Sequence, residues 1–534
     1  MTDREVRSAR NSPPTETYEV CVVGAGITGM NALVVASKYL SRTDQVVLVD
    51  SRPRVGGMWV DTYDYVRLHQ PHAIFTAGNI KWALRQKPSH LATKSEVLDH
   101  FQHCLDIAKK HVDVEERFGW DYESHEETGG RVFVTMRSPE GETAVIVAKR
   151  LIKAFGHLVQ PNDPLATSSS QVHSVTPETL DLDSEAVRDD QSPWWIVGSG
   201  KTAMDTAHRL ISEFPGREVS MLAGPGTFFA RRDTFFPVGA RRWWAGTTIN
   251  TMLRQVGRRF DGTNEDDVRE WFRATYGIGP TSEAKDFFSA YLSDSECETI
   301  TAGLRTVENE YFVDAVDRDG GVELVYRSGR TRMVPSGSWL VNCTGSLLRE
   351  SHPYEPFVSE AGTTLSIQMR SSTTGVFSAF AGYYLTHLMF TGQLGRVGLY
   401  ELDIQDLSGK AKPIVIYASM TLALHNLSII ADALPKKALM DCGLDYDLWY
   451  PLPRRMVGVA EFLRTHRSDR AHHRETLDTL GRRFNVRAGP LATPDRLAEA
   501  LHTLAPDLDT AAGPAPKDDL PVSAPESSRH TNPR

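Results

Sequence analysis

The strongest constraint on this chain is a pattern of strand, glycine loop, helix and strand that occurs twice. In the first copy, an apolar stretch at 18–23 leads into the loop Gly24-Ala-Gly-Ile-Thr-Gly29. A helical pattern then runs to Leu40, and a second apolar stretch at 45–49 ends with Asp50. Short apolar runs on either side of a glycine loop and a helix predict a βαβ unit.

The second copy lies in the middle of the chain. An apolar stretch at 194–197 leads into Gly198-Ser-Gly-Lys-Thr-Ala203, followed by a helix over 204–213 and a strand over 218–222. Each copy is followed by alternating apolar stretches and a short terminal strand that ends in glycine. These stretches are 131–136, 143–148 and 151–156 after the first copy, and 322–326, 330–334 and 339–345 after the second. The repetition predicts an α/β protein with two Rossmann-like domains, the second inserted in the first.

Composition narrows the range of partners. The net charge of −9, with both signs mixed along the chain, makes nucleic acid and anionic membranes unsuitable partners. Charges and prolines occupy the N-terminus where a secretory signal needs an apolar core, so we expect a cytoplasmic protein. The apolar stretch 413–435 contains Ser419, His425, Asn426 and Asp432, which predicts a buried helix and no membrane span.

The five cysteines are scattered and form no Cys-x-x-Cys pair, and no histidines cluster at metal-ligand spacing. We therefore expect neither a redox dithiol nor a metal site. Cys21 and Cys343 lie in apolar runs, where a cysteine is usually a small buried hydrophobic residue.

The first glycine loop has the residues that a dinucleotide diphosphate requires. Gly24 permits the tight turn after the strand, Gly26 lets the backbone approach a diphosphate, and Gly29 allows the helix to pack closely. The start of the helix then offers free N–H groups to the anion. Asp50 ends the second strand and can accept hydrogen bonds from ribose hydroxyls. Gly56-Gly57-Met58-Trp59 follows at the distance of a loop that folds back over the dinucleotide, although a plain turn is an equal interpretation.

The second loop predicts a nicotinamide site at Gly198, Gly200, Lys201 and Thr202. Its strand ends at 222–224 without a carboxylate, and Arg231 and Arg232 lie just beyond. Because no carboxylate repels a 2′-phosphate and a guanidinium binds one well, the sequence favours NADPH over NADH. A solvated, charged loop is the competing interpretation of the arginine pair.

At these residues the sequence resembles the class B flavin-dependent monooxygenases, which include flavin-containing monooxygenases, N-hydroxylases and Baeyer-Villiger enzymes. The resemblance covers about residues 18 to 400. It rests on both glycine loops with Asp50 and Asp205, and on the runs Gly56-Gly57-Met58-Trp59, Arg67-Leu-His-Gln-Pro71 and Asn342-Cys-Thr-Gly345. It implies FAD at the first loop and NADPH at the second. It also implies that O₂ reacts at flavin C4a as a (hydro)peroxide and that the protein supplies orientation and a dry pocket.

The resemblance also suggests residues near the reacting groups. His69, Gln70 and His72 become candidates for contacting NADP⁺ or the oxygenated flavin, with Arg67 beside the cofactor, although a structural loop is about as plausible. The run 375–382 resembles a returning strand that would place Gly382 near the pyrophosphate or ring, with Gly345 at the end of another strand.

One motif of the family is mostly missing. The fingerprint between the two loops survives only as His173-Ser174, with Thr167, Ser169 and Pro177 in its other places. His173 is a candidate catalytic residue, and a structural role is nearly as plausible. The loss favours oxygenation at nitrogen or sulfur of a small organic substrate over Baeyer-Villiger chemistry. An NAD(P)H:acceptor flavin reductase and a non-catalytic FAD-binding redox sensor remain alternatives.

The remaining segments are expected to support these domains. The aromatic insertion at 228–244 predicts a lid or a subunit contact, which would fit a homo-oligomer. The polar helix expected near 496–504 belongs to a helical C-terminal extension. The expected boundaries are disordered tails at 1–16 and 507–534, the FAD-binding domain at 17–165 and 336–450, the NAD(P)H-binding domain with a helical insertion at 190–335, and the extension at 451–506.

Overall fold

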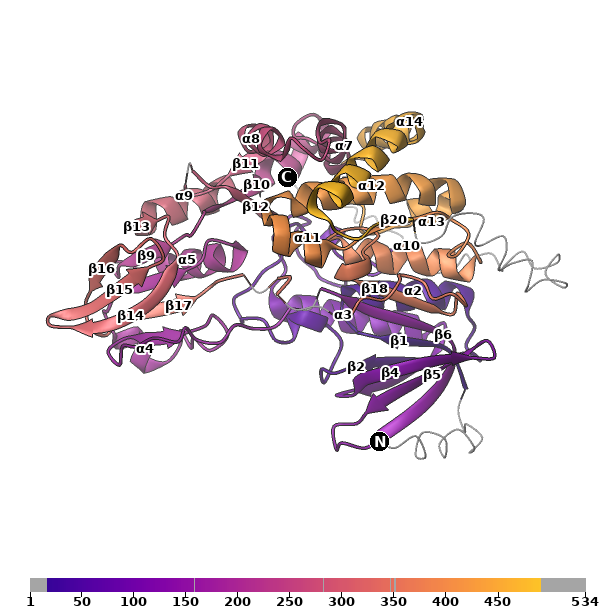
Figure 1. The fold of residues 1–534 in the computed structure, drawn as a ribbon, viewed down its shortest axis with the longest axis horizontal. Helices are drawn as coiled ribbons and strands as arrows, with labels where there is room; N and C mark the ends of the chain where they lie inside the picture. Colours follow the sequence, from indigo (N-terminus) through magenta and orange to yellow (C-terminus); the bar gives the residue numbers. More distant parts are fainter. Residues whose placement is uncertain (1–16, 158, 282, 346, 350–351, 491–534) are drawn as a thin grey trace, which may run out of the picture.

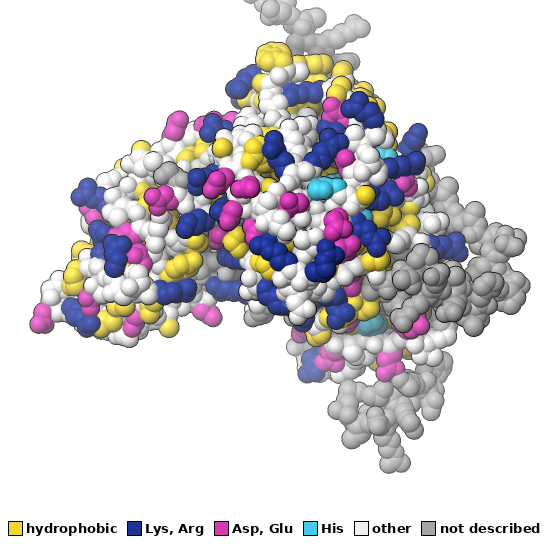
Figure 2. Space-filling view, turned by 45° about the horizontal axis from the view of Figure 1, so that its top comes forward, with side chains coloured by type: hydrophobic (Ala, Val, Ile, Leu, Met, Phe, Trp, Pro, Cys, Tyr) yellow, Lys and Arg dark blue, Asp and Glu magenta, His cyan; other side chains and the backbone are white. Residues whose placement is uncertain are grey.

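The fold has two lobes, one built on a mixed sheet and the other on a parallel sheet, in the computed structural model of this chain (Figure 1). The structure describes residues 17–157, 159–281, 283–345, 347–349 and 352–490. The tails at 1–16 and 507–534 and the helix expected near 496–504 lie outside these residues. Acidic and basic side chains are interspersed over the face drawn in Figure 2, as the mixed sequence charge predicts.

The first lobe contains the seven-stranded sheet, in the order β3-β2-β1-β6-β5-β4, with β18 also paired to β6. Its elements are β1 (Thr17–Val23), α2 (Ile27–Tyr39), β2 (Gln45–Asp50), β3 (Asp113–Phe118), β4 (Asp121–Thr128), β5 (Arg131–Arg137), β6 (Thr143–Gly156) and β18 (Thr364–Gln368), with α3 (Lys94–Lys109) packed on α2. The expected βαβ unit is present. The separation of 143–148 from 151–156 was wrong, because β6 is one strand whose first half pairs with β5 and whose second half pairs with β18.

The second lobe repeats this plan with a five-stranded parallel sheet, in the order β13-β9-β8-β17-β7. Its elements are β7 (His173–Val175), α4 (Glu185–Asp189), β8 (Trp194–Val197), α5 (Lys201–Glu213), β9 (Val219–Leu222), α9 (Asp294–Gly303), β13 (Leu304–Glu308) and β17 (Trp339–Asn342), with the antiparallel meander β14 (Phe312–Arg318), β15 (Gly321–Tyr326) and β16 (Thr331–Val334). The chain returns to the first sheet at β18, which confirms that the second lobe is inserted in the first.

The aromatic insertion forms an additional layer and mostly contributes to a hydrophobic core. Its elements are β10 (Thr227–Arg231), α6 (Arg232–Phe235), η3 (Gly239–Trp243), α7 (Ile249–Arg259), α8 (Glu265–Tyr276), β11 (Gly277–Ile278) and β12 (Asp286–Leu292). Phe228, Phe235 and Phe236 are buried in a core cluster that includes residues of the C-terminal helices. Trp243 and Trp244 remain exposed.

The C-terminal helices cover the first lobe and contact the insertion. They are α10 (Ser378–Phe390), α11 (Ile404–Ala411), α12 (Val415–Ala433), α13 (Lys436–Met440) and α14 (Leu452–Phe484), with the short turns η5 (Lys412–Ile414) and η6 (Tyr446–Trp449) and the strand pair β19 (Tyr400–Leu402) and β20 (Ala488–Pro490). The segment Ile404–Ala433 is apolar and long enough to cross a membrane, but 78% of its most apolar window is buried inside the protein. This burial supports the interpretation of 413–435 as a core helix.

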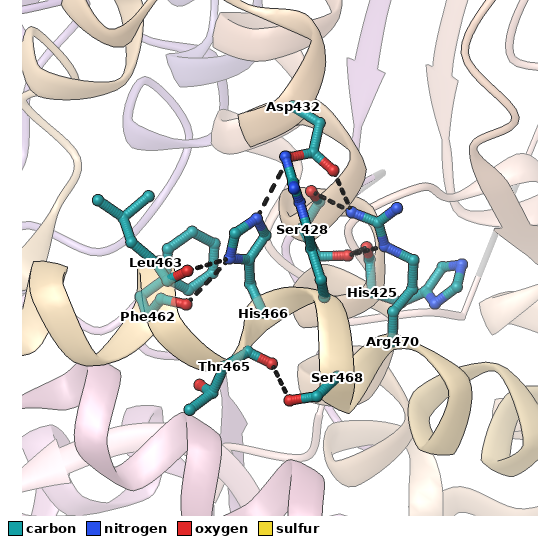
Figure 3. Close-up of polar contacts among 10 residues, drawn as sticks. His425, Ser428, Asp432, Phe462, Leu463, Thr465, His466, Ser468 and Arg470 are labelled. Atoms are coloured by element: carbon teal, nitrogen blue, oxygen red, sulfur yellow. Dashed lines mark hydrogen bonds and ion pairs between the residues drawn. The ribbon is translucent and has the colours of Figure 1, made fainter.

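A polar cluster fixes α14 to α12 (Figure 3). Asp432 of α12 accepts hydrogen bonds from Arg467 and Arg470 of α14, at 2.8 and 2.7 Å, and lies 3.3 Å from His466 Nε2. These partners hold the pKa of the Asp432 carboxyl well below its usual value, through the Arg467 hydrogen bond first. The cluster therefore attaches two arginines of α14 to one carboxylate of α12 and orients the helix.

The strand expected over 375–382 was wrong. Gly375 lies in a turn with a φ of +61°, and the apolar run after it forms the helix α10. The strand that returns to the first sheet is β18, which precedes this turn. Gly382 consequently lies inside a helix. A Cβ at Gly382 would be 2.3 Å from the carbonyl oxygen of Thr28, because α10 packs directly on the first turn of α2.

This contact predicts opposite effects for two helical glycines. Gly382→Ala should lower the free energy of unfolding by about 1–3 kcal/mol, since the new methyl group must push α10 away from α2. Gly409→Ala in α11 meets nothing within 4 Å and should raise it by up to about 1 kcal/mol. Urea denaturation of both variants tests this, and equal effects would contradict the packing.

Candidate functional site

Both glycine loops open onto one cavity of about 1680 Å³ between the lobes. This is larger than the roughly 300–1,000 Å³ of an ordinary small-ligand pocket. Its wall also includes the 56–59 loop, much of the segment 62–75, and the ends of β9 and β17. The volume and the two loops fit a pair of dinucleotides better than one.

The first loop presents the start of α2 to the cavity. Gly24 has a φ of +103°, and a Cβ there would be 2.7 Å from the carbonyl oxygen of Ala154. A Cβ at Gly29 would be only 1.7 Å from the carbonyl oxygen of Gly24, so the helix could not approach the turn with any side chain at this position. Gly26 is the N-cap and provides no side-chain cap, which leaves the first N–H groups of α2 for an anion.

Asp50 binds the glycine loop as well as facing the cavity. Its carboxylate accepts hydrogen bonds from the N–H groups of Ala25, at 2.6 Å, and Arg52, at 2.8 Å. Burial raises the pKa of the Asp50 carboxyl, although both hydrogen bonds oppose that shift. Each oxygen keeps accepting capacity for a ribose hydroxyl.

The 56–59 loop lies against the first glycine loop. The N–H of Gly56 donates to the carbonyl of Ala25 at 3.0 Å, and a Cβ at Gly57 would be 2.7 Å from Gly26 Cα. Gly57, Met58 and Trp59 all line the cavity, and Met58 is 46% exposed. The arrangement is consistent with a loop that folds back over a dinucleotide.

The segment after this loop divides into residues that face the cavity and one that does not. Arg67, His69 and Gln70 line the cavity. Gln70 is buried, and its Oε1 has no hydrogen-bond partner among the described residues. His72 is not part of the lining, because its Nδ1 contacts the carbonyl of His90 at 2.9 Å and its ring packs on Trp82. This placement favours the structural interpretation of His72.

The second loop repeats the geometry of the first at α5. Gly198 has a φ of +124°, and a Cβ there would be 2.4 Å from the carbonyl oxygen of Cys343. Gly200 is the N-cap of α5, again without a side-chain cap, and the space beside it is open. Lys201 and Thr202 line the cavity with Gly345, whose Cβ position is also open.

Two tyrosines that the sequence did not single out join the lobes at this point. Tyr63 OH donates to the Asp205 carboxylate at 2.9 Å, and Asp205 also forms an ion pair with Lys201. Tyr65 OH lies 2.9 Å from the Thr206 hydroxyl. The segment beside the first loop is thus attached to the helix of the second.

His69 forms a third link. The backbone N–H of Tyr291 donates to His69 Nδ1 at 3.1 Å, so the proton of the neutral ring is on Nε2. Burial, with Lys201 and Arg232 nearby, lowers the pKa of His69 to about 3. Tyr291 follows a bulge in β12 at which Ser289 has a φ of +51°. This strained residue directs the Tyr291 N–H toward the imidazole.

Three other expected sites lie outside the cavity lining. Arg231 pairs with Asp294 at 3.5 Å and Arg232 with Glu296, and neither lines the cavity. His173 is on the edge strand β7, stacks on Trp339 with ring centroids 4.5 Å apart, and is also outside the lining. Gly382 packs α10 on α2, as described above, and is not a lining residue.

Different cations line the cavity where the second lobe's strand ends. Lys285 and Arg327 are lining residues there, together with Gly224 and Tyr311. The Arg327 guanidinium lies 4.3 Å from the centre of the Tyr311 ring. The backbone N–H of Lys285 donates to the carbonyl of Pro225 at 3.2 Å. No ion pair joins either cation to a carboxylate within the described part of the chain. Their separation in sequence from the glycine loop explains why the pattern did not reveal them.

Comparisons with known proteins give similarity at low identity. No protein-family profile matches the chain. Uncharacterised proteins from Mycobacterium tuberculosis and Mycobacterium bovis are each 23% identical to it over 416 residues, which is 73% of this chain and 70% of theirs.

Several solved structures follow a similar chain path. A flavin-containing monooxygenase from Stenotrophomonas maltophilia has a TM-score of 0.44 and 12% identity, covering 70% of this chain and 98% of its own. The polycyclic ketone monooxygenase from Thermothelomyces thermophila has a TM-score of 0.45 and 13% identity, and the match covers 86% of this chain and 90% of that one. The bacillithiol disulfide reductase from Staphylococcus aureus has a TM-score of 0.44 and 11% identity, and the match covers 71% of this chain and 100% of that one.

The tautomer of His69 leads to a prediction with a matched pair of variants. His69→Phe leaves the buried Tyr291 N–H without an acceptor and should lower the free energy of unfolding by about 1–3 kcal/mol. His69→Asn can place its oxygen where Nδ1 lies and should recover most of that loss. Urea denaturation at neutral pH measures both, and equal losses would contradict the contact.

The contribution of His69 to the free energy of unfolding depends on pH. Because the folded pKa of His69 lies below its unfolded value, the stabilising contribution of the neutral ring is present above pH 6.5. It is lost as the pH falls from 6.5 toward 3. The native protein should therefore lose more stability than His69→Asn over this range.

Proposed function

We propose that this protein is a cytoplasmic FAD- and NADPH-dependent monooxygenase that oxygenates a small organic substrate at nitrogen or sulfur. The observation that carries the proposal is that α2 and α5 both start without a side-chain cap at the same cavity. A helix start of this kind binds a diphosphate through N–H groups and the helix dipole. Two such starts at one cavity suit two dinucleotides whose rings react with each other.

The residues of the first lobe fit FAD. The 24–29 loop and α2 would hold its diphosphate, Asp50 a ribose, and the 57–59 loop would cover it. The unpartnered Oε1 of buried Gln70 provides an acceptor for a ring N–H, with Arg67 at the rim. When bound, the flavin would supply the redox chemistry and the reaction with O₂.

The residues of the second lobe fit NADPH. The 198–202 loop and α5 would hold its diphosphate. Lys285 and Arg327, which replace Arg231 and Arg232 in this role, would bind the 2′-phosphate, and the Tyr311 ring offers a surface for the adenine. His69 would donate a hydrogen bond from Nε2 while remaining neutral at physiological pH.

The apolar part of the wall supports a reaction that requires the exclusion of water. Ile74, Phe75, Phe288, Phe377 and Leu444 line the cavity. Such a wall would exclude water from the bound flavin and accept an uncharged organic substrate. The position of His173 on an edge strand, away from the cavity, supports heteroatom oxygenation over the Baeyer-Villiger alternative.

Reactivity with oxygen separates the proposal from its alternatives. The purified flavoprotein is reduced with NADPH without oxygen and then mixed with O₂ while the absorbance is followed. A long-lived species that differs from both reduced and oxidised flavin is expected. Immediate return to the oxidised spectrum would indicate a reductase, and failure of NADPH to bleach the flavin would indicate a sensor. Either result would reject the monooxygenase.

The assignment of the 2′-phosphate site gives a separate prediction. Lys285→Ala and Arg327→Ala should each raise the KM for NADPH by roughly 10- to 150-fold and leave that for NADH unchanged, since a hydrogen bond to a charged group is worth about 1.5–3 kcal/mol. Arg231→Ala is the control and should change neither KM appreciably. Steady-state kinetics with both nicotinamides test this, and a larger NADPH effect in the control would return the site to Arg231.

A further inference from the structure

One corner of the molecule gathers a large share of the exposed apolar side chains. Eight of the fourteen large hydrophobic residues exposed within the described ranges belong to η3, α13, α14 and their flanks. They are Val238, Trp243, Trp244, Met440, Leu452, Met456, Val457 and Leu463. We call this set the tryptophan face. Trp243 and Trp244 are 60% and 69% exposed, which is unusual for the largest apolar side chain.

Hydrogen bonds join these elements into one surface. Trp449 Nε1 of η6 donates to the carbonyl of Pro237 at 2.9 Å, and Arg242 Nε donates to the carbonyl of Trp449 at 2.7 Å. Arg454 of α14 donates to the carbonyl of Arg242 at 3.2 Å and also bonds the carbonyl of Gly246. The start of α14 is therefore anchored against η3.

Along α14 the exposed residues follow a helical repeat. Leu452 and Met456 are four residues apart, and Leu463 follows seven residues later, so all three lie on one side of the helix. Val457 is also 60% exposed and lies on a different side of α14. A continuous apolar stripe on the solvent side of a helix marks a binding surface more often than a random distribution does.

The charge of this face is basic although the whole chain carries −9. Arg241 and Arg464 are exposed and form no ion pair with a carboxylate of the described chain, whereas Arg242 and Arg454 bond only to carbonyls. The nearby acids are already neutralised, as Glu461 pairs with Arg254. Asp445 pairs with Arg455, and Asp432 binds Arg467 and Arg470 (Figure 3).

We propose that the tryptophan face docks on an anionic lipid surface. Indole rings prefer the boundary between apolar and aqueous phases, and arginines beside them attract acidic head groups. A second copy of this chain is a poorer occupant, because a symmetric contact would bring the same arginines of both copies together. The negative net charge of the whole chain disfavours anionic membranes in general. It does not exclude them from a local face that is positively charged.

Docking would also place the cavity next to the lipid. The turn η6 that anchors η3 also contributes Tyr446 to the cavity wall, and the neighbouring Leu444 lines it too. A docked protein would therefore have one wall of its cavity near the membrane, where apolar substrates accumulate.

Vesicle sedimentation of the full-length flavoprotein tests the proposal. The protein should pellet with vesicles of equal parts phosphatidylcholine and phosphatidylglycerol, and much less with phosphatidylcholine alone or at high salt. Trp243→Ser with Trp244→Ser should lower the vesicle affinity by at least tenfold. Arg241→Glu with Arg464→Glu should lower it by more than about 25-fold, since each basic residue near the surface contributes about fivefold.

Matched controls separate docking from a general loss of apolar or basic surface. Val313→Ser with Met333→Ser removes two exposed apolar side chains of the second lobe, and Arg305→Glu reverses an exposed charge there. These variants should pellet like the native protein, and every variant should retain its flavin absorbance. Absence of pelleting, or equal pelleting of face and control variants, would overturn the proposal. A dimer in light scattering that the Trp243 and Trp244 changes abolish would assign the face to a second copy and also overturn it.

Discussion

The site depends on the contact between each glycine-cornered turn and the helix that follows it. In the first lobe, the Cα of Gly29 approaches the carbonyl of Gly24 so closely that any Cβ would overlap it, and this brings the start of α2 to the cavity. In the second lobe, Gly198 approaches the carbonyl of Cys343 as Gly24 approaches that of Ala154, which places the turn before α5. Since neither helix has a side-chain cap, two sets of N–H groups are left for anions at the same cavity.

The two helix starts face one cavity only while the two lobes keep the same relative position. Tyr63 and Tyr65 connect the first lobe to α5, and His69 accepts the N–H of Tyr291 from the insertion. The strained Ser289 on the same strand is consistent with a position fixed by function. These links act at the cavity itself, so relative movement of the lobes would alter the distance between the two helix starts.

Local patterns predicted much of the fold and the loops, because a βαβ unit is encoded in a short stretch of apolar and glycine residues. They failed where distant segments decide the outcome. His72 and His173 have the right residue type, but Trp82 and Trp339 hold them away from the cavity. Arg231 and Arg232 are close in sequence to the second strand, yet Asp294 and Glu296 engage them. Tyr63, Lys285 and Arg327 reach the cavity through packing that no local spacing reveals.

The most direct test is whether the two rings meet. Single-turnover reduction of the bound flavin, without oxygen, can be measured with NADPH deuterated at either hydrogen of nicotinamide C4. Direct transfer within one cavity predicts that one of the two stereoisomers, and only one, slows the bleaching of the flavin by a primary isotope effect. Bleaching at the same rate with both, or no bleaching, would contradict two dinucleotides held ring to ring.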